Sequence, residues 1–402
     1  MSTFSEIPVL DLSLARDPAT KPAFLEELRH TLLEIGFLYI KNTGIDDELI
    51  EQVQKQGISF FDLPEEEKLR IEMKNAASFL GYSRLGGEIT KNDVDWREQV
   101  DISTPHELRK PGAPLYHNLH GPNQWPSSEL LPQFRGIIEA YLTSMSAVST
   151  FFTSLVAEAL GMPSTAFDKF FDKDQQHKLK IVKYPDISQL NPLNGADGLS
   201  VTERQGVGPH KDSMLTSYLL QASHHRGLQV QNAAGTWIDV PPIKGTLVVA
   251  IGQGLEALTS GVCTSTTHRV LSPAPGSGPR FSLPFFQGVS YDATFESMDV
   301  PADVRALKKS DEIRKGEVEF TFVKGRWNHL GEATLFNRVR SHQDVGEKWY
   351  PDLLKEVRET QAQEARDREA KEAKEKAADL GRSQDSGHIG NGVVPSTAVQ
   401  AH

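Results

Sequence analysis

Residues 210–221 read His210-Lys-Asp-Ser-Met-Leu-Thr-Ser-Tyr-Leu-Leu-Gln221, and this stretch decides how the rest of the chain is interpreted. Its second half, from Leu215 to Gln221, is short and carries apolar, β-branched and aromatic residues, which is typical of a strand. Similar runs follow, separated by Gly, Pro and Asn, at residues 227–230, 237–240, 246–251, 262–271 and 281–286. Many short strands at close intervals predict a sandwich or jelly roll rather than a parallel sheet with helical crossovers.

The segments on either side of this strand-rich region predict helices and two further strands. Short apolar runs at residues 7–12 and 37–42 read as strands, and residues 24–35 carry apolar side chains at helical spacing. A second helix is expected from about Asp46. A long amphipathic helix is expected over residues 137–156, with Gly161 and Pro163 as its stop. A helical segment returns after Asn328. The chain is therefore expected to fold as a mixed α and β protein.

Composition excludes several classes of protein. The 402 residues carry a formal net charge of −11, which argues against a general affinity for nucleic acid or an anionic membrane. Cys263 is the single cysteine, so an internal disulfide is excluded and a reducing compartment is favoured. The N-terminus lacks the pattern of a signal peptide, and no run reaches the uninterrupted apolar length of a membrane span. We expect a cytoplasmic protein that binds a small molecule; a monomer is plausible.

Five polar residues in this region point to chemistry. His210 and Asp212 are followed by His268 on a strand-like run, and then by Arg280 and Ser282. Two imidazoles and one carboxylate suit Fe(II) on one face and leave the opposite positions open, whereas a structural zinc more often recruits thiolates. Residues two apart on a strand project to the same face, so His210 and Asp212 are expected to share one, and His268 is expected from a separate strand of a closed or folded sheet.

Arg280 and Ser282 predict a second binding function beside the metal. A planar guanidinium can hold a carboxylate through two charge-assisted hydrogen bonds, and Ser282, on the same face, can add a hydroxyl donor. A surface salt bridge is the alternative for Arg280. A His-x-acid pair alone is weak, because about two are expected by chance in a chain of this composition. His342 and Asp344 form such a chance pair, in a helical region with no Arg-x-Ser after it.

These motifs together resemble one enzyme family. His210-Lys-Asp212, Gly227-Leu-Gln-Val, Trp237-Ile-Asp-Val-Pro-Pro, His268-Arg-Val and Arg280-Phe-Ser282 resemble the Fe(II)- and 2-oxoglutarate-dependent dioxygenases of the isopenicillin N synthase-like group. The runs at residues 7–12 and 36–44 look like that group's leading domain. The resemblance covers residues from about 5 to about 350 and implies a double-stranded β-helix (jelly-roll, cupin-like) core with flanking helices.

The resemblance also implies roles for particular residues. His210, Asp212 and His268 would be the iron ligands, and Arg280 and Ser282 would anchor the distal carboxylate of 2-oxoglutarate. Tyr184 matches the Tyr of the family's Asn-x-Tyr-Pro element, which contacts the cosubstrate in many members. Here Val182 stands where that Asn usually does, which implies an altered pocket wall. The cofactors would be Fe(II), 2-oxoglutarate and O2, with ascorbate stimulatory.

On this basis the expected reaction is hydroxylation of a small organic molecule, with desaturation or cyclisation as other outcomes of the same site, plausibly in secondary metabolism or catabolism. Three alternatives stay open. One is an isopenicillin N synthase-like oxidase that does not use 2-oxoglutarate, because that enzyme keeps the Arg-x-Ser pair. The others are a non-catalytic jelly-roll binding protein with a vestigial metal site and a zinc hydrolase, although no obvious general base accompanies the ligands.

The expected organisation follows from the resemblance and the change of pattern along the chain. Residues 1–115 form the N-terminal region, 116–178 the long helix and linker, 179–290 the jelly-roll core, 291–360 a C-terminal segment with a helix, and 361–402 a charged helix with a tail disordered from about Leu380. The polar stretch from Asp186 to Gly208 is expected to be a flap. The run from Asp95 to Asp101 is expected to line the substrate entrance or to pack Trp96 on the core.

Overall fold

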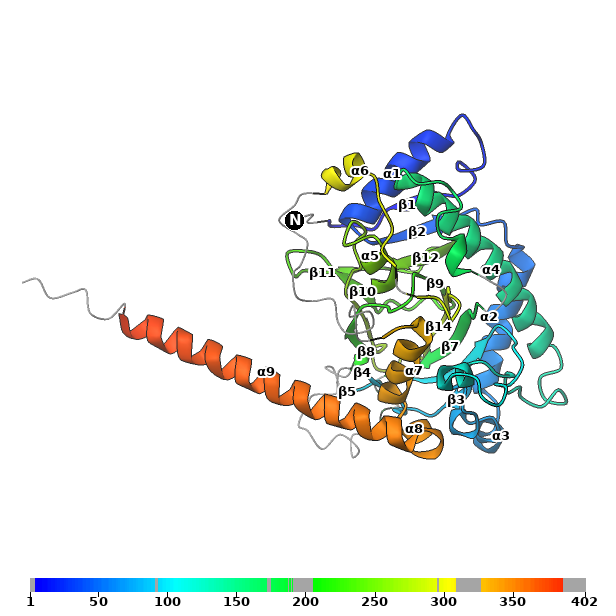
Figure 1. Ribbon diagram of the computed structural model, residues 1–402. Helices are drawn as coiled ribbons and strands as arrows, with labels where there is room; N and C mark the ends of the chain where they lie inside the picture. The colour runs from blue at the N-terminus through cyan, green and yellow to red at the C-terminus, as the bar shows by residue number, and fades with distance from the viewer. Residues whose placement is uncertain are drawn as a thin grey trace, which may run out of the picture. The chain divides into compact units, whose positions relative to one another are not determined.

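Two β-sheets packed face to face form the centre of the protein (Figure 1). The computed structural model describes residues 4–90, 93–171, 175–186, 188, 190, 205–294, 296–308 and 327–385. The larger sheet has eight strands, in the order β1 (Val9–Asp11), β2 (Phe37–Lys41), β12 (Thr246–Ile251), β9 (Thr216–Gln221), β14 (Arg280–Phe286), β7 (Lys178–Tyr184), β6 (Glu98–Ser103) and β3 (Gly81–Ser83). The smaller sheet has the order β11 (Trp237–Asp239), β10 (Leu228–Gln231), β13 (His268–Leu271) and β8 (Gln205–His210). This is the expected jelly roll.

The inner space between the two sheets is filled by apolar side chains from both. Tyr39 and Val248 of the larger sheet pack against Val207, Val230 and their neighbours on the smaller sheet. Strand pairs in both sheets are antiparallel, apart from the parallel pair of β1 and β2. A separate two-stranded hairpin is formed by β4 (Ile89–Thr90) and β5 (Asp93–Val94).

Helices cover the outer face of the larger sheet. Helix α1 (Lys21–Glu34) and helix α2 (Asp47–Phe61) both contact α4 (Phe134–Ala159), and α2 also contacts β7 and β14. Phe152 of α4 meets Tyr218 of β9 edge-on, with ring centroids 6.0 Å apart, inside the main apolar core. Of the described helices, α4 alone has the length and apolar composition of a membrane span, and more than half of that window is buried within the protein.

The remaining helices are short, except the last. They are α3 (Glu65–Arg70), α5 (Gln253–Leu258), α6 (Ala302–Leu307), α7 (Leu330–Ser341) and α8 (Gln343–Trp349), with 3-10 turns at Met73–Asn75, Leu115–Leu119 and Asp168–Phe170. The chain divides into two units, residues 1–350 and 351–402. Helix α9 (Pro351–Asp385) belongs to the second unit and, by itself, is a long charged helix. It continues past Leu380, so the expectation of disorder from that point is wrong as far as Asp385.

One predicted strand is mostly a loop. Residues 262–271 were expected to be extended, yet only β13 (His268–Leu271) is a strand. The Thr-rich part before it instead caps the end of α1: the amide of Thr264 donates to Leu32 O at 2.8 Å, and its hydroxyl donates to Leu33 O at 2.7 Å. Carbonyls at a helix C-terminus have no partner within the helix, so they compete successfully for these donors.

A glycine makes the close approach between this loop and α1 possible. Gly36 has a φ of +68°, and a Cβ atom placed there would lie 2.0 Å from the Thr264 carbonyl oxygen. We expect Gly36→Ala to lower the free energy of unfolding by at least about 3 kcal/mol, from left-handed backbone strain plus the clash. The measurement is urea unfolding.

Gly112→Ala is the matched control for this prediction. Gly112 has a φ of +82°, but nothing lies within 4 Å of the added Cβ atom, so only the backbone term applies. We expect a loss of about 1 to 2 kcal/mol for this variant. Equal losses in the two variants would contradict the packing role of Gly36.

Candidate metal and carboxylate site

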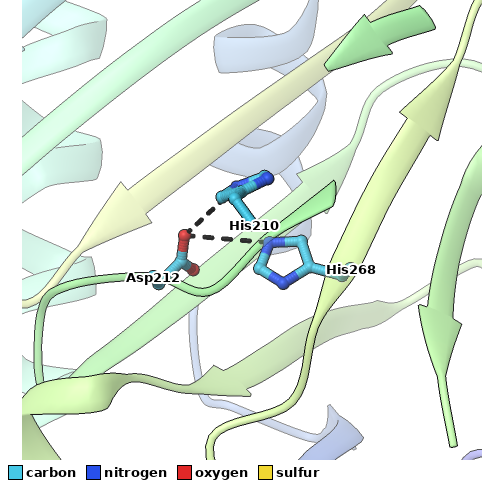
Figure 2. Close-up of side chains that lie close together, drawn as sticks. All are labelled: His210, Asp212 and His268. Carbon is cyan, nitrogen blue, oxygen red and sulfur yellow. Dashed lines mark ion pairs between the residues drawn. The ribbon is translucent and has the colours of Figure 1, made fainter. Parts of the chain in front are cut away.

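Three residues that could ligate a metal meet at one end of the smaller sheet. His210 is the last residue of β8 and His268 the first of β13, and the two are direct partners in the antiparallel register. One ligand atom from each of His210, Asp212 and His268 lies within 4.8 Å of the others. Figure 2 shows Asp212 facing both imidazoles, with its Oδ1 atom 3.6 Å from His210 Nε2 and 3.7 Å from His268 Nε2.

The route by which these residues meet differs from the sequence expectation. Asp212 lies beyond the end of β8, so shared strand alternation does not bring it beside His210. Its loop is held instead by the start of α5, where the amide of Gln253 donates to Asp212 O at 2.7 Å. His268 comes from the neighbouring strand of the same sheet, so the two histidines need no sheet closure.

Backbone carbonyls orient both imidazoles. Nδ1 of His210 lies 2.8 Å from Gly208 O, and Nδ1 of His268 lies 3.3 Å from Thr266 O. A carbonyl can only accept a hydrogen bond, so each Nδ1 carries a proton, and Nε2 is the nitrogen that faces Asp212 and can ligate a metal once it is unprotonated. Metal-ligating histidines are usually oriented in this way by a group on their other nitrogen. The donor set and its orientation fit a divalent ion.

The charges of the three residues are coupled. Burial alone lowers the pKa of His210, but the hydrogen bond and charge of Asp212 outweigh it and hold that pKa above its ordinary value. Burial, with repulsion from His210, lowers the pKa of His268 to about 4. Burial raises the pKa of Asp212, but the His268 and His210 imidazoles outweigh it, so this carboxyl stays ionised well below the usual range. One carboxylate and one readily neutral imidazole are thus ready to ligate.

Arg280 has the properties of a carboxylate-binding residue. It opens β14 and is 1 % exposed, which excludes a surface salt bridge. Its Nη2 atom donates to Gln221 Oε1 at 3.2 Å, whereas its buried Nε and Nη1 have no hydrogen-bond partner among the described residues. Burial lowers the pKa of Arg280 although Tyr184 partly offsets it. A buried guanidinium without an acidic partner is costly, so this geometry fits an incoming carboxylate.

Ser282 and Tyr184 lie where a carboxylate held by Arg280 could reach them. Ser282 is two residues along β14, on the same face as Arg280, and is buried. Tyr184 of β7 is the direct register partner of Arg280, and the Arg280 Cζ atom lies 5.1 Å from the Tyr184 ring centroid. Val182 is fully buried opposite Ser282, so this part of the wall is apolar.

Three polar residues of this region were not predicted. Gln221 holds Arg280, and the Ser217 hydroxyl lies near enough to help lower the pKa of Asp212. Alternation along the expected strand 215–221 would have put Ser217 and Gln221 on one face. Arg97 is the third: its Nη2 donates to Glu88 Oε2 at 2.6 Å and to Asp95 Oδ2 at 3.1 Å. Its burial could not be foreseen, because Glu88 lies on the other side of the β4–β5 hairpin and meets Arg97 only when that hairpin folds.

The other residues considered from the sequence have structural roles. His342 is buried, its Nε2 lies 3.5 Å from Glu88 Oε1, and burial lowers its pKa to about 3, while Asp344 is exposed. Cys263 is fully buried, which raises its thiol pKa to about 12. The expected flap, Asp186 to Gly208, lies largely outside the described residues.

Two family models match the chain. Residues 180–289 match the 2OG-Fe(II) oxygenase superfamily, and residues 7–128 match the N-terminal region described as non-haem dioxygenase in morphine synthesis. The first match spans the strands that carry His210, His268 and Arg280. The second spans the leading segment whose strands join the larger sheet.

Curated relatives and solved structures agree with these matches. The chain is 66% identical over 368 residues to the 2-oxoglutarate-dependent dioxygenase frbJ of Dothideomycetidae sp. (strain 11243), covering 90% of this chain and 97% of that one. It is 39% identical over 399 residues to a 2-oxoglutarate-dependent dioxygenase of Gibberella zeae, covering 96% and 100%. The crystal structure of a full-length Neurospora crassa protein in complex with alpha-KG and thymine superposes with a TM-score of 0.61 at 25% identity, covering 76% and 93%.

Metal binding by the three residues can be measured as stabilisation. We expect Fe(II), under argon and at about 100 times its dissociation constant, to stabilise the wild-type protein by about 2.7 kcal/mol. Asp212→Ala is expected to lose this stabilisation because it removes the one anionic ligand. Thermal unfolding with and without the metal is the measurement.

Asp344→Ala is the control, since it removes the acid of the second His-x-Asp pair. It should keep the full stabilisation by metal. A metal response that survives in Asp212→Ala, or that is lost equally in both variants, would show that the ion binds elsewhere.

Proposed function

Because the chain belongs to the 2OG-Fe(II) oxygenase superfamily and is a 2-oxoglutarate-dependent dioxygenase, we propose that His210, Asp212 and His268 hold its iron and that Arg280, Ser282 and Tyr184 hold its cosubstrate. The enzyme is an oxidoreductase that uses Fe(II), 2-oxoglutarate and O2. The observation that carries the cosubstrate assignment is the buried guanidinium of Arg280, two of whose nitrogens have no hydrogen-bond partner among the described residues.

Bound Fe(II) supplies the redox chemistry that couples decarboxylation of 2-oxoglutarate by O2 to oxidation of the substrate, with succinate and CO2 as coproducts. The chain's own part is positioning. The Gly208 and Thr266 carbonyls hold the Nδ1 side of both rings, so Nε2 of His210 and His268 would be the nitrogens that ligate the metal. The loop tied to Gln253 brings Asp212 to the same point. Because these three residues would hold the metal from one side, the cosubstrate and O2 would reach it from the other.

Arg280 orients the cosubstrate from the far end. The outer edge of the guanidinium, formed by Nη1 and Nη2, can donate two charge-assisted hydrogen bonds to one carboxylate, which would satisfy the unpartnered Nη1. Gln221 prevents the guanidinium from rotating, since it accepts from Nη2. The hydroxyls of Ser282 and Tyr184 can donate further bonds. The apolar wall around Val182 and Val207 excludes water, which strengthens these interactions.

The substrate is proposed to be a small organic molecule, and hydroxylation the reaction. The Neurospora crassa structure that superposes on this chain holds thymine, a small heteroaromatic molecule, which supports this class. We also propose that the protein is cytoplasmic and monomeric. Cell fractionation tests its location, and size-exclusion chromatography with light scattering tests its oligomeric state.

Arg280→Gln tests the cosubstrate site. Loss of two charge-assisted bonds, each worth about 1.5 kcal/mol or more, should raise the KM for 2-oxoglutarate at least about 100-fold. Arg269→Gln is the control, since Arg269 lies over the Trp237 ring at 4.0 Å and bonds Gln229 on the smaller sheet. Steady-state succinate formation is the measurement. An unchanged KM in Arg280→Gln would contradict the assignment.

Dependence on 2-oxoglutarate separates this enzyme from an oxidase of the same fold. We expect one succinate per oxidised substrate, and no substrate oxidation when 2-oxoglutarate is omitted, because all the electrons beyond those of the substrate come from the cosubstrate. Succinate and substrate loss are measured together by mass spectrometry. Equal substrate oxidation without 2-oxoglutarate would favour the oxidase.

A further inference from the structure

A chain of alternating buried charges crosses the inner face of the larger sheet. The nitrogen and oxygen atoms of successive charged groups lie between 2.6 and 3.8 Å apart. In order, the members of this series of ion pairs are Asp95, Arg97, Glu88, Lys180, Asp101 and Arg338. The series begins beside β8, the strand that ends at His210, where the amide of Gly208 donates to Asp95 Oδ1 at 3.4 Å. It ends at Arg338 on α7. Three acids and three bases balance, which offsets the cost of burying them.

Lys178 lies near the Arg338 end of this series of ion pairs but is not a member of it. It is 7 % exposed, and its ammonium group makes no hydrogen bond or ion pair with any described residue. Burial and the neighbouring Arg338 charge hold the pKa of Lys178 well below its ordinary value, with only Asp101 opposing them. The Arg338 Nε atom is also buried without a hydrogen-bond partner among the described residues. Lys178 and Arg338 are therefore two interacting cations, and each has an N–H group that donates to no described residue.

The strand register puts Lys178 level with the metal ligands. The Ser217 hydroxyl helps to lower the pKa of Asp212, and Ser217 of β9 is the register partner of Phe286 on β14. Phe286 is in turn the register partner of Lys178 on β7. Direct antiparallel partners share a face, and neighbouring strands lie about 4.8 Å apart, so Ser217 and Lys178 are about 10 Å apart on the inner face. Figure 1 shows β9, β14 and β7 side by side.

The cosubstrate anchor lies at the other end of the same strands. Gln221 and Arg280 are four and six residues from Ser217 and Phe286 along β9 and β14, and Tyr184 is six residues from Lys178 along β7. Each step advances about 3.3 Å. Lys178 is therefore too far from Arg280 to share a carboxylate with it, and it lies on the side of the metal away from that anchor.

We propose that Lys178, assisted by Nε of Arg338, binds a carboxylate of the enzyme's substrate. The inference rests on the proposed function, since it takes the metal and the cosubstrate to bind as assigned above. A single negative charge matches Lys178, the cation that pairs with no described residue beside an otherwise balanced cluster, and this favours a carboxylate over a phosphate dianion. A carboxylate held there would leave a carbon several ångströms away free to lie near the metal.

The test compares an acid with its uncharged isostere. Hexanoate and hexanamide are titrated, by ligand-observed NMR, into enzyme loaded with Fe(II) and 2-oxoglutarate under argon. Wild type is expected to bind hexanoate at least about tenfold more tightly than hexanamide, and Lys178→Met should remove this preference while Lys178→Arg keeps most of it. Lys183→Met is the control: it changes the same strand, but Lys183 pairs with Glu98 at 2.9 Å on the helix-covered face.

Stability distinguishes a binding residue from a structural one. Lys178→Met replaces an unpartnered buried amine, so its urea midpoint should equal or exceed that of wild type, whereas Lys180→Met breaks two ion pairs and should lower it. The proposal is wrong if hexanamide binds wild type as tightly as hexanoate, if hexanoate does not bind up to about 20 mM, if it displaces 2-oxoglutarate, or if Lys178→Met keeps the preference. Failure of 2-oxoglutarate itself to bind wild type would instead contradict the cosubstrate assignment.

Discussion

The antiparallel pairing of β13 with β8 is the constraint on which the site depends. It places His268 directly opposite His210, so two imidazoles face one point without any contribution from distant segments. Each ring is then oriented by a carbonyl two residues before it in the sequence, so a local contact places a proton on Nδ1. Only the carboxylate needs help from elsewhere, through the contact of the Asp212 loop with α5.

The larger sheet has two different faces, one that packs against the helices and one that faces the smaller sheet and its two histidines. Leu179 and Ile181 of β7 face the helices and join the main core, whereas Val182 and Tyr184 face the smaller sheet, because side chains alternate along a strand. The inner face can therefore carry buried charges without weakening the core that packs against α1, α2 and α4. Those charges come from the N-terminal hairpin, β6, β7 and α7, so the N-terminal region is part of the site's inner wall.

Local pattern in the sequence was sufficient for the secondary structure that depends on periodicity. The strands near residues 215–221, 246–251 and 281–286 and the long helix α4 were predicted close to their observed bounds, because alternation and helical spacing are visible within a few residues. The loop before His268 was not, because its Thr side chains are used to cap α1, more than 200 residues away in the chain. Propensity cannot report a partner that distant.

The strand pattern by itself predicted a sandwich or jelly roll, and the family resemblance implied the jelly-roll core. The sequence also identified His210, Asp212, His268, Arg280 and Ser282 as candidates, since those residue types at those spacings suit iron and a carboxylate. Only the tertiary structure decided how they meet: Asp212 from a loop, His268 from the adjacent strand, and Arg280 buried with no acidic partner in the part of the chain that the structure describes. It alone identified Gln221, Arg97 and Lys178, whose ammonium group pairs with no described residue. The physical reason is that burial and charge pairing depend on which strands become neighbours, and no local stretch of sequence carries that information.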